Sequence, residues 1–147
     1  MNEIIKTALP IICKDWAARL TGEETTERML ELFISEPQFQ EFCFENDYPS
    51  LEMLREIADV AEQFNVIIDR KSHLLNPAFA AIFGNSEVSI ECSGYSVCCI
   101  VARHDSIVTV SSCDHAIVDV QLYDNAQVIW REVNDGTRTI VTRHNKS

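Results

Sequence analysis

The sequence predicts an α+β fold, in which an N-terminal helical part is followed by a C-terminal β-solenoid of ten-residue repeats. Three observations predict this fold. Apolar residues recur every three or four positions before residue 64, polar and apolar residues alternate after residue 83, and turn-forming residues then return every ten positions. We therefore expect an acidic helical region at 1–64, a strand and connector at 65–82, six repeats at 83–142 and a tail at 143–147.

The first two helices follow from apolar spacing and from a capping motif. Apolar residues at three-to-four spacing predict a helix face over residues 5–20, and Pro10 is expected to kink that helix or to mark the first turn of a new one. The segment Thr21-Gly22-Glu23-Glu24 has the form of a capping box, with a hydroxyl residue three positions before a glutamate. This motif predicts a second helix that runs to about Ile34.

The remaining elements before the repeats are two helices, a strand and a connector. Pro37 to Phe44 is predicted to form a short helix, and Ser50 is a suitable N-cap for a further helix that ends near Phe64. The apolar run at 65–69 predicts a strand. We interpret Lys71 to Pro77 as a connector into the repeats.

The repeat region consists of six blocks of ten residues that align without a gap. The fourth position of every block is small, and the sixth and eighth positions are mostly apolar. Because side chains alternate along a strand, positions four, six, eight and ten share one face, which we predict to be the core. In the last block this frame puts Arg138 at position six and Ile140 at position eight. The blocks start at Phe83, Ser93, Arg103, Cys113, Tyr123 and Val133.

Two architectures satisfy this pattern, and we favour the solenoid. In a solenoid two blocks form one coil, which gives about three coils, whereas in an antiparallel meander each block is one strand of a hairpin. The small residue always follows the bend, as a tight corner requires. Trp130 stands at the inward eighth position and is expected in the core or as an end cap. We expect the helical part to pack on the solenoid or to cap one end, because bare strand edges invite aggregation.

The blocks Cys113-Asp114-His115-Ala116-Ile117-Val118 and Tyr123-Asp124-Asn125-Ala126-Gln127-Val128 resemble a known type of repeat. They are similar to the D-N-A-x-V-x-V decapeptide repeats of phage and mobile-element proteins from gut bacteria, over about residues 83–142. The resemblance implies a β-repeat fold and an accessory or interaction role, without catalytic residues to transfer. Cys98, Cys99 and Trp130 depart from the repeat but leave the fold prediction unchanged.

The acidic charge of the chain is concentrated in the helical part. The net charge is −11, and residues 21–62 hold twelve acidic residues against two basic ones. A surface of this sign is the opposite of what a direct nucleic-acid binder shows. It favours either a basic protein surface as partner or simply solubility, because amphipathic helices normally expose charged faces. The side chains that we expect to bind such a partner are Glu24, Glu27, Glu31, Glu52, Glu56 and Asp59.

A cysteine and two histidines at the repeat turns are candidates for catalysis. His104, Cys113 and His115 belong to neighbouring blocks, and a histidine that approaches a cysteine can deprotonate it to a nucleophile. The alternative interpretation is that turns favour aspartate, asparagine and histidine for their backbone conformation, and that Cys113 fills a corner. We favour this alternative, so that an enzyme at the turns remains a lesser hypothesis.

We expect no metal site and no cofactor. The six cysteines include no C-x-x-C pair, and Cys98 and Cys99 lie on opposite faces of one predicted strand. Cys92, His104, Cys113 and His115 would have to supply the remaining ligands. The four glycines are isolated, so a phosphate-binding loop is also not expected.

The sequence contains neither an apolar run long enough to span a membrane nor a recognisable signal peptide. We therefore expect a cytoplasmic protein with reduced cysteines and no membrane partner. The predicted function is that of a non-enzymatic interaction protein, accessory to a phage or mobile element. A narrower alternative is an acidic inhibitor of a host nucleic-acid-binding or defence protein. A homo-oligomer is a further expectation, because solenoid ends can associate.

Overall fold

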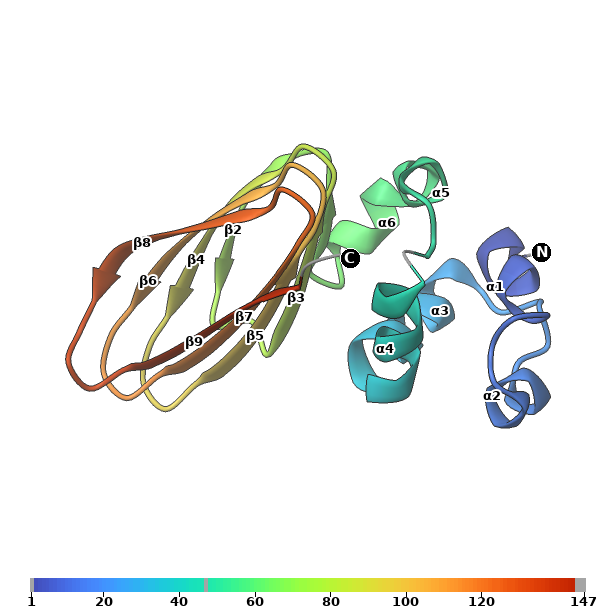
Figure 1. Cartoon of the computed structure of the whole chain (residues 1–147), viewed down its shortest axis with the longest axis horizontal. Coiled ribbons are helices and arrows are strands. Elements are labelled where there is room, and N and C mark those ends of the chain that lie inside the picture. Colours follow the sequence, from blue (N-terminus) through green and yellow to red (C-terminus); the bar gives the residue numbers. More distant parts are fainter. Residues whose placement is uncertain (1, 47, 145–147) are drawn as a thin grey trace. The chain divides into compact units, whose positions relative to one another are not determined.

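The chain folds into two compact units, which are Met1–Phe64 and Asn65–Ser147. The computed structural model describes residues 2–46 and 48–144 (Figure 1). The first unit is helical and the second consists of strands, as the sequence predicts. Within the described ranges, no helix is long and apolar enough to cross a membrane.

The helical unit is made of short helices. Pro10 lies between the first two of them, so it ends a helix instead of kinking it. The predicted helix from Ser50 to Phe64 is likewise interrupted at Ile57. The helices of the described residues are α1 (Glu3–Ala8), α2 (Lys14–Arg19), α3 (Thr26–Ser35), α4 (Pro37–Glu45), α5 (Leu51–Glu56) and α6 (Ala58–Glu62).

One predicted helix start is wrong. The N-cap of α3 is Thr25, whose side chain accepts a hydrogen bond from the Arg28 N–H. The predicted cap, Thr21, is instead held in a turn, because the Glu24 carboxylate accepts hydrogen bonds from the backbone N–H groups of Thr21 and Gly22 (2.9 and 2.8 Å). The Glu24 half of the capping box therefore forms, but in the turn before the helix, where the Thr21 hydroxyl accepts from the Glu23 N–H instead. The Ser50 cap of α5 is confirmed.

Aromatic side chains hold the helical unit together. Trp16 meets Phe39 edge to face at 5.8 Å between ring centres, and Phe33 meets Phe44 in the same way at 5.8 Å. The Trp16 indole N–H also donates a hydrogen bond to the side-chain carbonyl of Gln38 (3.0 Å). These contacts connect α2 and α3 to α4, which compensates for helices that are too short to be stable alone.

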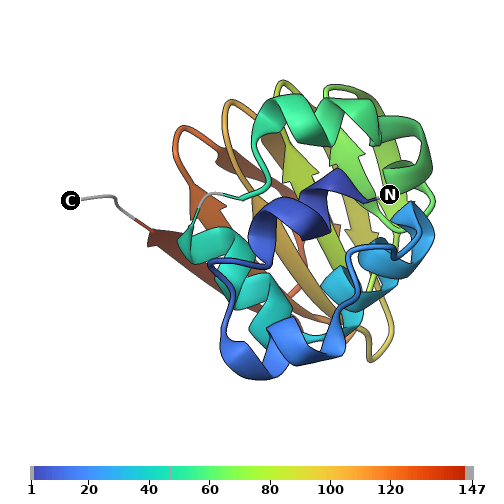
Figure 2. The same ribbon diagram turned by 90° about the vertical axis from the view of Figure 1, so that its right-hand side faces the viewer.

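The second unit is a β-solenoid with two parallel sheets. The five-stranded sheet has the order β1-β3-β5-β7-β9 and the four-stranded sheet the order β2-β4-β6-β8. All pairs are parallel, which rules out the antiparallel meander. Figure 2 shows the coils following one another in chain order from green to red. The strands are β1 (Val66–Ile68), β2 (Lys71–Leu75), β3 (Phe79–Phe83), β4 (Glu87–Cys92), β5 (Val97–Ala102), β6 (Ile107–Ser112), β7 (Ile117–Tyr123), β8 (Gln127–Val133) and β9 (Arg138–His144).

The solenoid begins before the predicted repeats. The expectation that Lys71 to Pro77 is only a connector is wrong, because Lys71–Leu75 is strand β2. Val66 lies opposite Ala81, fifteen residues further on, whereas Val97 lies opposite Ile117, twenty residues further on. The first coil is therefore shorter than the later ones, which removes it from a ten-residue frame.

The inward face of the repeats forms the core, as predicted. Along β4 and β7 every second side chain is buried, and Ile100 stacks between Ala80 and Val120 of the neighbouring coils. The small residues of position four line the corners, and three of them are fully buried: Ser106, Ala116 and Ala126. The small position thus marks a corner that has no room for a larger side chain.

The gap-free alignment fails in the last block. Val110 lies opposite Trp130 but Ser111 lies opposite Glu132, so Arg131 is an extra residue in a β-bulge. Beyond the bulge, Val118 lies opposite Thr139 and Val120 opposite Val141. The assignment of Arg138 and Ile140 to inward positions is therefore wrong, since the inserted residue reverses the faces of β9. Trp130 is half-buried against the core, which agrees with the prediction for it.

Candidate functional site

The candidate catalytic residues lie on two opposite edges of the solenoid. The His104 edge carries the corners from the five-stranded to the four-stranded sheet, at 84–86, 103–106 and 124–126. The Cys113 edge carries the return corners at 93–96, 113–116 and 134–137. Strand β6 separates His104 from Cys113, and its six residues alone span roughly 16 Å at about 3.3 Å per residue. The structure therefore does not bring His104 together with Cys113 and His115.

His104 stabilises the stacking of coils. Its φ of 61° is in the left-handed region, and its Nδ1 accepts a hydrogen bond from the Gly84 N–H of the preceding coil (3.0 Å). In turn the His104 N–H donates to Oδ2 of Asp124 in the following coil (3.2 Å). Nδ1 is therefore engaged by the backbone and is not free to act as a base.

The Cys113 edge also lacks the features of a nucleophilic site. His115 is stacked on Tyr95 at 5.2 Å between ring centres. Partial burial and the adjacent Asp114 carboxylate raise the pKa of the Cys113 thiol. A catalytic cysteine needs the opposite shift, because the thiolate is the nucleophile. We conclude that these residues shape the corner, which is the interpretation favoured from the sequence.

The cysteines of strands β4 and β5 have thiols in packed surroundings, and two of these thiols have a raised pKa. Cys92 and Cys98 are buried in the solenoid core, and their mutual hydrogen bond, together with burial, raises the pKa of the Cys92 thiol. Cys99 lies on the other face of β5, where burial and the Asp119 carboxylate raise the pKa of its thiol. Among the described residues, no three histidine, cysteine or acidic side chains are grouped as a metal would require.

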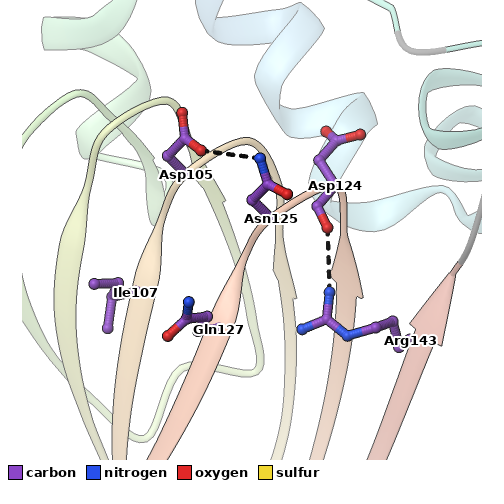
Figure 3. Close-up of a pocket in the computed structure, with 6 residues that line it drawn as sticks. All are labelled: Asp105, Ile107, Asp124, Asn125, Gln127 and Arg143. Carbon is purple, nitrogen blue, oxygen red and sulfur yellow. Dashed lines mark hydrogen bonds between the residues drawn. The ribbon is translucent and has the colours of Figure 1, made fainter.

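A polar cavity of about 510 Å³ lies at the His104 edge (Figure 3). Asp105 and Asn125 lie at its rim, where the Asn125 amide donates a hydrogen bond to the Asp105 carboxylate (3.3 Å). Arg143 reaches the cavity from β9. The remaining lining comes from one corner and from the outward face of two strands: Ile107, Asp124 and Gln127.

Arg143 donates to two corner carbonyls of the last described coil. In the coil before, the carbonyls of His104 and Ser106 accept hydrogen bonds from the Asn125 and Gln127 N–H groups. The equivalent carbonyls twenty residues later belong to Asp124 and Ala126, and the Arg143 guanidinium donates to both of them (3.2 and 2.6 Å). Arg143 therefore caps this corner, because its guanidinium satisfies carbonyls whose equivalents in the coil before accept from backbone N–H groups.

Removal of this cap should loosen the last coil. For Arg143→Ala we expect a loss of about 1.5–3 kcal/mol in the stability of that coil, as for hydrogen bonds from a charged donor. Faster hydrogen exchange of the β9 amides would measure it. Arg143→Lys is the matched control, because it keeps the charge but not the two-pronged geometry. Wild-type exchange in the alanine variant would contradict a capping role.

The predicted partner-binding carboxylates are not equivalent. Glu24 is only partly exposed; partial burial alone would raise its pKa, but the hydrogen bonds from Thr21 and Gly22 outweigh burial and lower it. Glu24 therefore serves the turn before α3. Asp59 is exposed on α6 and also has an interaction within the protein.

The four other predicted carboxylates are exposed on two helices. Glu27 and Glu31 lie on α3, and Glu52 and Glu56 lie on α5. Glu31 forms an exposed ion pair with Arg28 (3.3 Å). Such a pair adds little stability and leaves the carboxylate accessible. The helical unit therefore presents two pairs of accessible carboxylates.

Comparisons with protein-family models, with curated proteins and with solved structures found no match to this chain.

The capping role of Arg143 and the role of Asp124 were not predicted from the sequence. The signal for Asp124 was present, because Asp114 and Asp124 both occupy the second position of a block, where the structure has a positive φ (59° and 55°). Aspartate tolerates this conformation, and its carboxylate can reach the N–H of the preceding coil. Arg143 left no such signal, since its position depends on the bulge at Arg131.

Proposed function

We propose that the protein is a non-enzymatic interaction protein whose helical unit binds a basic protein surface. The like-charge pairs Glu27–Glu31 and Glu52–Glu56 support this proposal most strongly, because each pair is exposed and four residues apart on one helix. Like charges at this spacing destabilise a helix by about 0.2–0.5 kcal/mol per pair. A solvated helix does not need them, whereas a cationic partner would convert the repulsion into attraction and faster association.

The wider role that we propose is that of an accessory protein of a phage or mobile element. The likeness of the decapeptide blocks to repeats of such proteins supports this role. A second candidate is an acidic inhibitor of a host nucleic-acid-binding or defence protein. The concentration of twelve acidic against two basic residues in 21–62 favours it, since a surface that binds phosphates also attracts carboxylates.

Charge reversal should abolish the interaction. We expect the protein to capture one basic partner from a host lysate, and the variant carrying Glu27→Lys, Glu31→Lys, Glu52→Lys and Glu56→Lys to bind it at least about a hundredfold more weakly, since like charges across an interface cost several kcal/mol. Binding should also fall at about 1 M salt, where the Debye length is only about 3 Å. Quantitative pull-down followed by a titration of the purified partner gives both values.

The matched control changes acidic residues of the solenoid instead. Glu87→Lys, Glu91→Lys and Glu132→Lys alter exposed side chains. The ion pair of Glu87 with Lys71 and the hydrogen bond of Glu91 with His73 are themselves exposed. These changes should leave the captured partner in place. Equal loss in both variants would indicate an effect of net charge alone. Full retention after reversal of the helical carboxylates would contradict the proposal.

A further inference from the structure

The last coil of the solenoid has an exposed apolar surface. Strands β8 and β9 are the outermost strands of their sheets among the described residues, so one side of each lacks a strand partner there. Val128 and Trp130 are only half-buried where the core ends. Four large hydrophobic side chains of these two strands are about half exposed: Ile129 (49%), Val133 (44%), Ile140 (52%) and Val141 (46%).

Two features prevent another full coil from stacking on this end. The bulge at Arg131 interrupts the regular hydrogen-bonding register of β8, a common way of protecting an edge strand. The Arg143 guanidinium already occupies the corner carbonyls of Asp124 and Ala126, to which a further coil would donate. Among the described residues, the edge of β9 is in regular register and has no strand partner, which suits a single added strand.

The free hydrogen-bonding groups of β9 can be assigned. The Arg138 N–H donates to the Ala116 carbonyl, so Arg138 and every second residue after it face β7. Thr139, Val141 and Arg143 therefore turn their N–H and C=O groups toward the open side. Strand β9 pairs with β7 in register over all seven of its residues, without a bulge.

The charge of this edge selects between possible occupants. Strand β9 contains Arg138, Arg143 and His144 but no acidic residue. In an antiparallel pair of two β9 strands centred on Val141, Arg138 of one copy would lie opposite His144 of the other, and Arg143 opposite Thr139. Because β9 contains no acidic residue, self-pairing would offer no opposite charge to Arg138, whereas opposite-charge pairs across strands stabilise a sheet. An acidic segment would instead be attracted.

We propose that the edge of β9 binds an extended segment of a partner protein, in which apolar and acidic side chains alternate. The apolar side chains of the segment would lie over Val141 and the open core near Trp130. The acidic ones would lie on the outward face, beside Arg138. Backbone hydrogen bonds to Thr139, Val141 and Arg143 would provide affinity, as in other cases of strand addition. This inference does not depend on the carboxylates of the helical unit.

A labelled nine-residue peptide that alternates valine and glutamate is the probe. We expect it to bind the full-length protein in a fluorescence anisotropy titration and to slow hydrogen exchange at Thr139, Val141 and Arg143. A peptide that alternates valine and lysine should bind at least about tenfold more weakly, a difference of about 1.4 kcal/mol. Failure of the glutamate peptide to bind, or equal binding of the two peptides, would overturn the proposal.

Two variants test the edge itself. Val141→Pro removes one N–H that faces the open side and no N–H that pairs with β7, so the strand should tolerate it; we expect at least about tenfold weaker binding. Arg138→Glu should weaken binding of the glutamate peptide and strengthen binding of the lysine peptide. This variant still tests the proposal if the proline variant unfolds. Arg131→Glu, the matched control in the bulge of β8, should bind normally.

Two further results would overturn the proposal. One is unchanged binding in both Val141→Pro and Arg138→Glu. The other is a dimer, seen by sedimentation equilibrium, that protects the β9 amides and excludes the peptide, because a second copy would then be the occupant. Neither result bears on the helical carboxylates, so failure here is separate from failure of the proposed function.

Discussion

Replacement of Ile100 by alanine is expected to destabilise the solenoid by about 2–5 kcal/mol, the range for a buried isoleucine truncated in a packed core. Ile100 is 1% exposed and stacks between Ala80 and Val120. Its neighbours belong to a parallel stack and cannot collapse into the space without losing ladder hydrogen bonds. The cavity should therefore remain and weaken the coils on both sides.

The stability of the solenoid can be measured separately from that of the helical unit. The chain has two tryptophans, Trp16 in the helical unit and Trp130 in the last coil. In a Trp16→Phe background, denaturant unfolding followed by fluorescence reports on Trp130 alone. Hydrogen exchange of the β5 and β7 amides gives a second reading. A loss below about 1 kcal/mol would contradict the burial of Ile100 in a rigid core.

Ile140→Ala is the matched control and tests the register of the last coil. The ten-residue frame places Ile100 and Ile140 at the same eighth position, yet Ile140 is 52% exposed. We expect its truncation to change stability by no more than about 0.5 kcal/mol. Equal losses in the two variants would mean that the bulge at Arg131 does not exist in solution.

This comparison also shows how far a periodic sequence predicts its own structure. The inward face, the small corner residues and the parallel stacking follow from residues such as Ala116 and Val118, because every coil repeats the same requirement. The single inserted residue, Arg131, has no local signature, since arginine is unremarkable at an exposed position. Its effect is visible only when the strand is paired with β6.

The first coil was predicted only in part, because a strand was expected at 65–69 but not at Lys71–Leu75. Its pairing distances are fifteen and sixteen residues instead of twenty, so β2 falls outside the frame of the later blocks. Asn65, Asp69 and Asn76 nevertheless adopt a positive φ (60°, 53° and 50°). A search for asparagine and aspartate at corners, instead of for a fixed period, would have detected this coil.

The candidate site was predictable only in part. The acidic helical surface follows from composition, because charges that are not paired in a small helical unit must face solvent. His104 and Cys113 are separated because successive strands alternate between the two sheets, so that consecutive corners lie on opposite edges of the solenoid. The cap formed by Arg143 combines a bulge, a reversed face and a long side chain, none of which the repeat pattern contains.

Replacement of Asp124 should show the second large effect, because its carboxylate has two roles at the corner. Oδ2 accepts the hydrogen bond of the His104 N–H (3.2 Å) and lies 3.6 Å from Nε of Arg103. Arg103 is 2% exposed and also packs its guanidinium on Tyr123. For Asp124→Ala we expect a loss of about 3 kcal/mol, which combines a charge-assisted hydrogen bond with strain of about 1 kcal/mol from alanine at a φ of 55°.

A series at this position separates the contributions. Asp124→Asn keeps an acceptor and tolerates the left-handed conformation, so its loss should be the smallest, about 1 kcal/mol. Asp124→Gly keeps the backbone conformation but removes the acceptor, and its loss should lie between those of asparagine and alanine. The Trp130 unfolding signal gives the three stabilities, and hydrogen exchange of the His104 amide reports the lost cap directly.

The order of the three stabilities decides between two explanations of the aspartate at the corner 124–126. If the carboxylate matters chiefly as an acceptor, glycine and alanine should both accelerate exchange of the His104 amide, while asparagine should not. If only the backbone conformation matters, glycine should match the wild type and alanine alone should lose stability. Because Gly84 and Gly94 occupy the same position in earlier coils, the second outcome would mean that the aspartate of the later coils adds no stability beyond what glycine provides.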